Sequence, residues 1–414
     1  MNILIINHYA GSKNYGMEFR PWYFAKYWQE AGYKVFIVAA SNAHTRNKQP
    51  YVEYDLQSEL VDGVEYLWLK TPSYSGNGVG RIKNMFTFIR KLKKYRKQIA
   101  SITKPDVVIA SSTYPLDNYS AKRIADISGG QYIYEIHDLW PLSPMELGGY
   151  SKYHPFIFVM QQAENFSYAH ADKVVSVLPC VQQHVIEHGL SANKLFYVPN
   201  GICLDDWNNA IKAPDEYYDM IEKQHQQGKT CVAYAGAHGV ANMLDTFIEA
   251  AALLMDDARF HFFLMGDGAE KTKLIQLSQQ KKLHNVTFLD SISKNAIPSI
   301  LPEFDILYLG LKNQPLFRFG IGPNKLFDYM MAAKPIIMAI NAGNDIVSEA
   351  NCGYTVESEN PAAIVTALNK IYVLSPEQKV ILGNNGKNYV LKNHEYRNLA
   401  NKFLEIMFAK DVQQ

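Results

Sequence analysis

Short apolar runs alternate with longer amphipathic stretches along the first half of the chain. The runs have the length of buried strands, and the stretches between them repeat their apolar positions at helical spacing. A helix is expected over 18–31, closed by Gly32. Strands are expected at 2–7, 34–40, 64–70, 106–111, 132–136 and 173–177. This alternation is typical of a doubly wound parallel sheet, which binds ligands beyond the carboxyl ends of its strands.

The same alternation starts again in the second half. Between the halves, Asn200-Gly201 predicts a sharp turn, and the polar, helix-like stretch up to Lys229 is interpreted as an interdomain connection. Strands are expected at 231–235, 260–265, 286–289, 305–309, 336–340 and 354–356, and helices at 242–255, 270–281, 324–333 and 361–374. We therefore expect two α/β domains, 1–199 and 200–394, with a C-terminal helix in 395–414 that crosses back to the first.

The segment 320–335 predicts a loop, a helix and a strand. Pro323 suits the first helical position, because its missing N–H costs nothing there. On a helical wheel Lys325 and Asp328 lie together, away from the apolar face. The helix start attracts anions, Lys325 adds a full charge, and Asp328 is placed to bind a hydroxyl group. A diphosphate joined to a ribose fits this geometry; a surface helix with a weak Lys–Asp pair is the alternative.

Composition excludes little. At 414 residues the chain has room for two or three domains, and its formal charge of +1 indicates no partner. The four cysteines have no metal-binding spacing and are read as reduced thiols in the cytosol. We expect no signal peptide and no membrane-spanning segment, because no apolar run approaches about 20 residues.

The segment 81–97 is strongly basic. It holds eight lysines and arginines and no acid, and its apolar residues recur at helical spacing. Such a helix suits an anionic membrane surface. The alternative is a helix packed on its own sheet with a solvated basic face. Nucleic acid is not expected as a partner, because no known binding module accompanies the patch.

His137 and Asp138 follow the predicted strand 132–136. The imidazole can donate to a sugar hydroxyl or a phosphate near neutral pH, and Asp138 can orient it or accept from a substrate hydroxyl. A structural turn that packs Trp140-Pro141 is the alternative. Further glycine-containing loops follow the strands at 2–7, 231–235 and 260–265.

The runs Gly322-Pro323-Asn324-Lys325-Leu326-Phe327-Asp328 and His137-Asp138-Leu139-Trp140-Pro141 resemble glycosyltransferase family 4, the retaining GT-B enzymes, in their O-antigen, capsule and exopolysaccharide branch. The resemblance implies two Rossmann-like domains that face a cleft. It implies donor contacts from Gly16, Gly236, His238, Gly266, Arg318, Gly322, Pro323, Asn324, Lys325, Leu326 and Asp328. It also implies catalytic roles for His137 and Asp138, and acceptor contacts from Glu18 and Arg20.

Three positions depart from the family pattern. Gly320 stands where the wider family has a glutamate, and Ala237 and Asn242 replace its usual basic pair. The resemblance therefore leaves the diphosphate to Arg318 and Lys325, with His238 as a helper.

The implied activity is transfer of a sugar from a UDP- or GDP-sugar to a lipid-linked saccharide, at the cytoplasmic face of the membrane. No cofactor or metal is expected, since no Asp-x-Asp pair is present to hold a divalent ion. A nicotinamide-dependent oxidoreductase is disfavoured by the absence of Gly-x-Gly-x-x-Gly after a strand. A catalytically silent sugar-nucleotide-binding protein at the membrane stays open because of the three departures. The sequence leaves the sugar, the base and the acceptor undetermined.

Overall fold

The computed structural model describes residues 1–76 and 78–408. It divides into two compact units. The first is Met1–Asn200 together with the last helix, α16 (Tyr396–Phe408), and the second is Gly201–Glu395. This division lies one residue from the predicted one, and residues 409–414 of the predicted C-terminal segment lie outside the described residues.

Unit 1 is built on an eight-stranded sheet with the order β3-β4-β2-β1-β5-β6-β7-β8. Its strands are β1 (Asn2–Ile6), β2 (Lys34–Ala40), β3 (Gln57–Val61), β4 (Val64–Leu69), β5 (Val107–Ala110), β6 (Gln131–Ile136), β7 (Lys173–Ser176) and β8 (Leu195–Tyr197). Every pairing is parallel except that of β3 with β4. The hairpin between these two strands turns at Asp62-Gly63, where both residues have positive φ angles. Strand β3, an edge strand with polar residues, was not predicted from the sequence.

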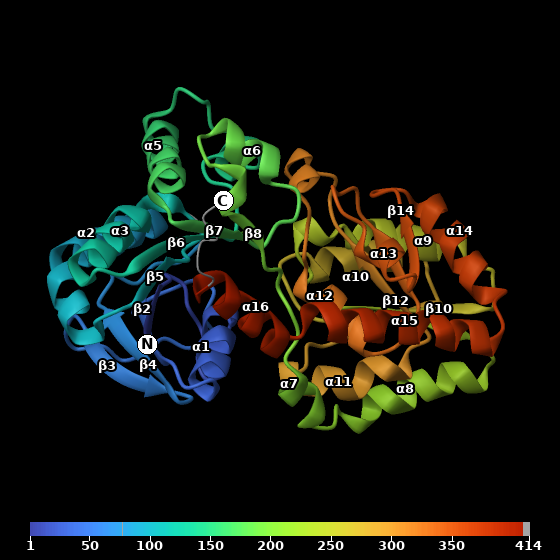
Figure 1. The fold of residues 1–414 in the computed structure, drawn as a ribbon. Coiled ribbons are helices and arrows are strands. Elements are labelled where there is room, and N and C mark those ends of the chain that lie inside the picture. The colour runs from blue at the N-terminus through green and yellow to red at the C-terminus, as the bar shows by residue number, and fades with distance from the viewer. Residues whose placement is uncertain (77, 409–414) are drawn as a thin grey trace. The chain divides into compact units, whose positions relative to one another are not determined.

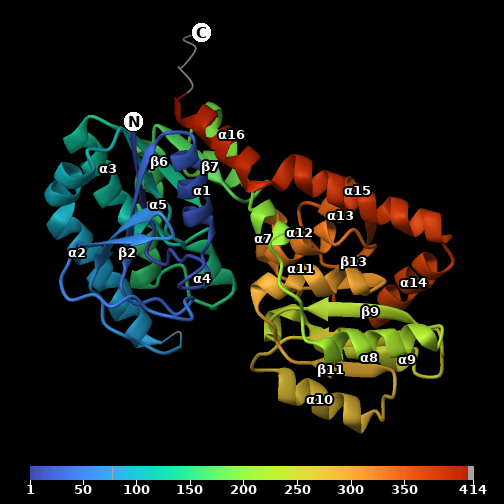
Figure 2. The same ribbon diagram turned by 90° about the horizontal axis from the view of Figure 1, so that it is seen from below.

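Helices cover both faces of this sheet (Figures 1 and 2). They are α1 (Arg20–Glu30), α2 (Val79–Thr103), α3 (Asn118–Ser128), α4 (Leu142–Glu146), α5 (Pro155–His170) and α6 (Gln182–Glu187), besides α16. Helix α1 packs against α16, and the Trp28 indole donates a 3.0 Å hydrogen bond to the Ala400 carbonyl. Helix α1 begins at Arg20, two residues later than predicted.

Unit 2 is built on a six-stranded, all-parallel sheet with the order β11-β10-β9-β12-β13-β14. Its strands are β9 (Thr230–Ala235), β10 (Phe260–Met265), β11 (Val286–Leu289), β12 (Ile306–Gly310), β13 (Ile336–Ala339) and β14 (Gly353–Val356). Its helices are α7 (Leu204–Asn208), α8 (Asp215–Gln226), α9 (Leu244–Leu253), α10 (Lys271–Gln280), α11 (Ile297–Ile300), α12 (Asn324–Met331), α13 (Ile346–Glu349), α14 (Pro361–Tyr372) and α15 (Pro376–His394).

Two apolar clusters form the core of unit 2. One contains residues of α8 and α12, and the other contains residues of α9 and α14. Tyr217 and Ile221, one helical turn apart on α8, are buried in the first cluster. The stretch interpreted as an interdomain connection is therefore partly a core helix of unit 2.

The ends of the central strands place the candidate residues. In unit 1, β6 runs directly into His137; in unit 2, Gly236 and Gly266 follow directly after β9 and β10. Because parallel strands bring their carboxyl ends to one edge of a sheet, these candidate residues of each unit lie at that edge.

Candidate active site

Helix α12 and the loop before it form the candidate site of unit 2. Pro323 is the residue just before the helix, with extended backbone angles, so its predicted place as first helical residue is wrong by one position. The Asn344 side chain clamps the loop by accepting from the Ile321 N–H at 2.8 Å and donating to the Ile321 carbonyl at 3.0 Å. The Tyr329 hydroxyl bonds the backbone N–H and carbonyl of Ala235, which ties α12 to the end of β9.

Lys325 lies over the loop that follows β9. Its Nζ donates to Asn242 Oδ1 at 2.7 Å and lies 5.1 Å from the centre of the Tyr234 ring. Gly236 has a φ of +153°, which favours glycine, and a Cβ there would lie 2.4 Å from Lys325 Cε and would displace the end of the lysine side chain. Burial lowers the pKa of Lys325 to about 8.

No ion pair compensates this lysine within residues 1–76 and 78–408. The alternative of a weak Lys325–Asp328 surface pair is therefore wrong. Asn242, where the family pattern has a basic residue, provides the neutral partner of the lysine. The result is a partly desolvated ammonium group held only by neutral groups, at the start of a helix.

The loop after β10 is packed tightly against the loop after β9. Gly266 has a φ of +146°, and a Cβ there would lie 1.9 Å from the Gly236 carbonyl oxygen. His238 is fully buried between these loops, and neither of its ring nitrogens has a hydrogen-bond partner among the described residues. Burial, together with the charges of Lys271 and Lys325, lowers the pKa of His238 to about 4. Its imidazole is thus neutral, with both ring nitrogens buried and unbonded among the described residues.

Asp328 lies one turn after Lys325 and is half-buried. Trp207 Nε1 lies 3.4 Å from Asp328 Oδ1, which is a long and weak hydrogen bond. Burial raises the pKa of Asp328 to about 6, against the favourable charge of Lys294. As with Lys325, burial disfavours the charged form of this side chain, and its neighbours do not fully offset that cost.

The remaining predicted donor residues lie around the start of α12. Arg318 is exposed, donates to the Pro315 carbonyl at 2.7 Å and stacks on the Phe319 ring at 4.4 Å. Asn324 is exposed, Gly322 is half-buried, and Leu326 is buried in the core, where it positions the helix.

The candidate site of unit 1 lies at the end of β6. Glu135 is buried and bonded to Arg20 at 2.9 Å, to the Ser111 hydroxyl at 2.6 Å and to His137 Nε2 at 3.0 Å. Burial alone would raise the pKa of Glu135, but the charges of Arg20 and His137 outweigh it and hold that pKa at about 2. Because an ionised carboxylate only accepts, we assign a proton to His137 Nε2, which leaves Nδ1 as the second nitrogen of an oriented ring.

Asp138 does not orient this ring, contrary to one of the expected roles. Its carboxylate accepts from the Leu139 N–H at 2.9 Å, from Trp140 Nε1 at 3.2 Å and from the Ser143 hydroxyl. These bonds make Asp138 the centre of a turn. Glu135 orients His137 instead; the available sequence signal was an acid within an otherwise apolar buried strand, two residues before the histidine and so on the same side.

The predicted acceptor residues lie before and in α1. Arg20 is buried and donates to Glu135 and to the carbonyls of Val198 and Pro199, so its guanidinium is occupied within unit 1. Glu18 is half-buried and has a φ of +69°, which is uncommon for a residue with a side chain. Gly16 forms β-bridges with Ser12 and Arg46.

Comparison with known proteins identifies the family. Residues 15–206 match the model of "Glycosyltransferase Family 4", and residues 229–373 match that of "Glycosyl transferases group 1". The chain is 22% identical, over 73% of each protein, to the glycosyl transferase WcaI of Escherichia coli (strain K12), which is named for colanic acid biosynthesis.

Solved structures share the fold. Anabaena Alr3699/HepE, crystallised with UDP, has a TM-score of 0.68 at 13% identity and covers 99% of this chain and 100% of its own. WaaG, described as a glycosyltransferase involved in lipopolysaccharide biosynthesis, has a TM-score of 0.65 at 14% identity, over 99% and 100% of the two chains. The chain belongs to glycosyltransferase family 4, and its two parallel-sheet domains have the GT-B fold.

Proposed function

We propose that this glycosyltransferase transfers a hexose, with retention, from a nucleoside diphosphate sugar to a lipid-linked saccharide during assembly of a bacterial surface polysaccharide. The observation that carries the proposal is Lys325, an ammonium group with neutral partners at the start of α12. Such a group gains most from an anion, because the anion offsets the cost of its burial.

The donor half of the proposal concerns unit 2. The N–H groups at the start of α12 and the Lys325 ammonium bind the diphosphate, and the neutral His238 ring donates to it. Asp328, one turn further on, accepts from the ribose hydroxyls. Arg318 adds a second charge from the preceding loop.

We further propose that these cations, and no metal ion, stabilise the leaving diphosphate. Within the described residues, two groups of side chains have the geometry to hold a metal, and neither contains a residue of the proposed donor site. The charge that a metal would supply is instead available from Lys325 and from the helix start.

Relatives support the choice of ligands. HepE was crystallised with UDP, WcaI is named for colanic acid biosynthesis, and WaaG is described as acting in lipopolysaccharide biosynthesis. UDP is therefore the first nucleotide to test, with GDP beside it. A surface polysaccharide precursor is the first acceptor to test.

In unit 1 we propose that His137 contacts the transferred sugar. Its ring is held by Glu135 and Ser111 on one nitrogen, so the other nitrogen has a fixed direction. Glu18, which has an unusual backbone conformation two residues before α1, is the proposed acceptor contact. Arg20 and Asp138 support this arrangement through their internal bonds.

We also propose that α2 holds the protein on the cytoplasmic face of the membrane. The exposed face of the helix carries Ile82 and Phe86 at one end and a basic cluster at the other. The cluster is Arg90, Lys93, Lys94 and Lys97. Met85 and Leu92 are instead buried in unit 1, so the apolar positions of this helix serve both the core and the surface. Within residues 1–76 and 78–408, no helix combines the length and the apolar character that a membrane crossing requires.

The donor proposal is tested by calorimetry with UDP and GDP. Lys325→Gln should weaken nucleotide diphosphate binding about 10- to 100-fold, because a charge-assisted contact contributes about 1.5–3 kcal/mol. Lys281→Gln is the matched control, since Lys281 pairs with Glu249 on the same unit at 2.9 Å. Equal affinity in wild type and Lys325→Gln would remove the proposed phosphate site.

The transfer itself is tested with extracted lipid acceptor and mass-shifted sugar donors. A mass increase of one hexose on the lipid fraction supports the proposal. Nucleotide binding without any transfer would favour a silent binding protein, for which the departures at Gly320 and Ala237 are the sequence basis.

The membrane proposal is tested by sedimentation with phosphatidylglycerol liposomes. Replacing Arg90, Lys93, Lys94 and Lys97 by glutamine should release the protein, since each contributes about 1 kcal/mol near anionic lipid. Lys91→Gln is the control: Lys91 lies on the same helix but pairs with Asp55 at 2.7 Å. Wild-type protein that ignores anionic liposomes at low salt would contradict the proposal.

A further inference from the structure

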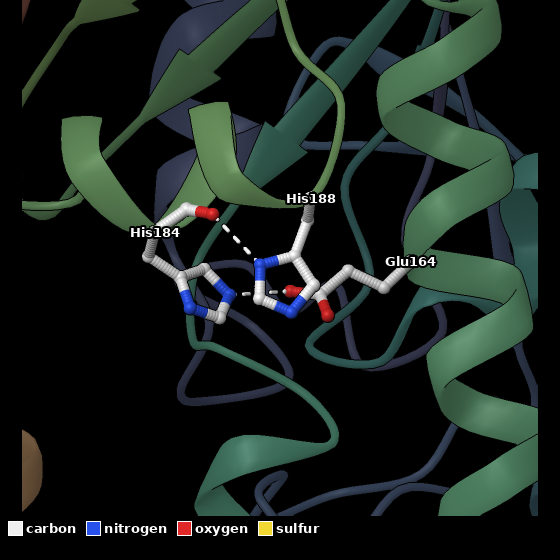
Figure 3. Close-up of side chains that lie close together, drawn as sticks. All are labelled: Glu164, His184 and His188. Carbon is white, nitrogen blue, oxygen red and sulfur yellow. Dashed lines mark hydrogen bonds and ion pairs between the residues drawn. The ribbon is translucent and has the colours of Figure 1, made fainter.

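Two histidines and a glutamate converge in unit 1, away from the residues assigned above. Glu164 extends from α5, His184 lies on α6, and His188 is the residue that follows α6 (Figure 3). The three side chains point toward one another, and one ligand atom of each lies within 4.8 Å of the others.

The local sequence explains why the histidines face the same way. They are four residues apart, so one helical turn places them on one side, and their rings lie 4.2 Å apart between centroids. His184 Nε2 lies 2.9 Å from Glu164 Oε1. His188 Nδ1 lies 2.7 Å from the His184 carbonyl oxygen, which can only accept, so Nδ1 carries the proton and Nε2 keeps a lone pair.

The cluster also has the supporting contacts that metal ligands need. An imidazole that donates one N–H to a backbone carbonyl is fixed in the tautomer and orientation of a ligand. Glu164 is 1% exposed and accepts from the Tyr168 hydroxyl at 3.0 Å and from Gln161 Nε2 at 2.7 Å. Its carboxylate is therefore held in place by two neighbours on its own helix, α5.

We propose that Glu164, His184 and His188 bind a divalent first-row transition metal, with Zn²⁺ as the ion to test. Two imidazoles and a carboxylate are ligands for such metals, whereas Mg²⁺ and Ca²⁺ prefer oxygen alone. Zn–N bonds are about 2.0–2.1 Å long, so the side chains adjust their spacing around the ion. Water completes the coordination, and the ion links α5 to α6.

A second cluster in unit 2 provides the contrast. His225, Cys231 and Asp305 also lie within ligand reach of one another. However, burial raises the pKa of the Cys231 thiol to about 12, which disfavours the thiolate form that metals bind. Asp305 Oδ2 accepts from the Cys231 N–H at 2.7 Å and lies 3.0 Å from His225 Nε2.

The metal site shares no residue with the proposed contacts to the donor or to the transferred sugar. Its test is therefore independent of the proposed reaction. The experiment uses the untagged full chain, stripped with a chelator and titrated with Zn²⁺ by calorimetry, and with Co²⁺ by absorption. We expect one equivalent of Zn²⁺, no binding of Mg²⁺, and a Co²⁺ spectrum without a thiolate band.

The variants locate the site. His188→Asn, at a half-buried position, should weaken Zn²⁺ binding at least tenfold while the circular dichroism spectrum stays unchanged, and Glu164→Gln should do the same. His225→Asn should bind Zn²⁺ like wild type. The proposal is overturned if wild type takes up no Zn²⁺, if His188→Asn binds it as tightly as wild type, or if His225→Asn alone loses it.

Discussion

The two units treat their buried charges in opposite ways. In unit 1, the Arg20 guanidinium and the Glu135 carboxylate are 2.9 Å apart, and Ser111 and His137 complete the set. In unit 2, the Lys325 ammonium has Asn242 and Tyr234 as its partners, which carry no charge.

The difference indicates which of the two candidate sites needs a ligand. In unit 1 the charges of Arg20 and Glu135 compensate each other. This group of side chains therefore keeps its geometry whether or not substrate is present. The lysine in unit 2 loses solvation without gaining a counter-ion, and its pKa falls to about 8. Binding of an anion reverses that loss, so unit 2 is where charge complementarity yields affinity.

The largest effect on stability is expected from removing one partner of the buried Arg20–Glu135 ion pair. Arg20→Ala leaves Glu135 buried without its counter-ion, which should lower the free energy of unfolding by about 3–5 kcal/mol in urea denaturation. Arg397→Ala is the control, because its pair with Glu30, at 2.9 Å, is exposed and should contribute less than about 1 kcal/mol. Similar losses in both variants would show that the buried pair has no special role.

Next in size is the effect of His137 on turnover. His137→Ala should lower kcat by about 10- to 100-fold and leave UDP affinity within twofold, because its partners hold it as a fixed contact for the reacting sugar. Steady-state kinetics and calorimetry on the same preparation separate the two quantities. Normal kcat in a folded variant would make the set around Glu135 purely structural.

A smaller, opposite effect on stability is expected in unit 2. The pKa of Asp328 is raised to about 6, so its carboxylate costs stability above that pH. Asp328→Asn should stabilise the ligand-free protein by about 1–2 kcal/mol at pH 7, and the gain should vanish as the pH falls from about 6 to 4. Thermal denaturation across this range checks the sign.

The same variant should lose ligand discrimination. Wild type should prefer UDP to 2′-deoxy-UDP, and Asp328→Asn should not, if Asp328 binds the ribose hydroxyls. A wild-type protein without that preference would leave Asp328 with no role in the donor site.

Local patterns in the sequence predicted most of the fold. The apolar runs of the central strands and the helical spacing of α9, α10, α12 and α14 are local signals, so the alternation and the fold class followed from them. Strand β3 was missed because an edge strand needs few apolar residues. Helix α8 was placed outside the core because Tyr217 and Ile221 are its buried residues, among polar ones.

The site was predictable only in part. Short runs beside strand ends indicated His137, Lys325 and Asp328. Their partners lie far away in sequence: Asn242 is 83 residues from Lys325, and Arg20 is 115 residues from Glu135. A single sequence contains no record of such pairings. Only the three-dimensional structure shows that Glu135 has a counter-ion and that Lys325 has none among the described residues.

The most direct test of this contrast is the proton uptake that accompanies UDP binding. At pH 8 about half of the Lys325 side chains are neutral in the free protein, given a pKa of about 8, and the bound diphosphate should restore their charge. Calorimetry at pH 8, in two buffers of different ionisation enthalpy, should therefore show uptake of a substantial fraction of a proton. Lys325→Arg, which stays charged, should bind UDP without uptake. UDP binding to wild type with no proton uptake would contradict the account.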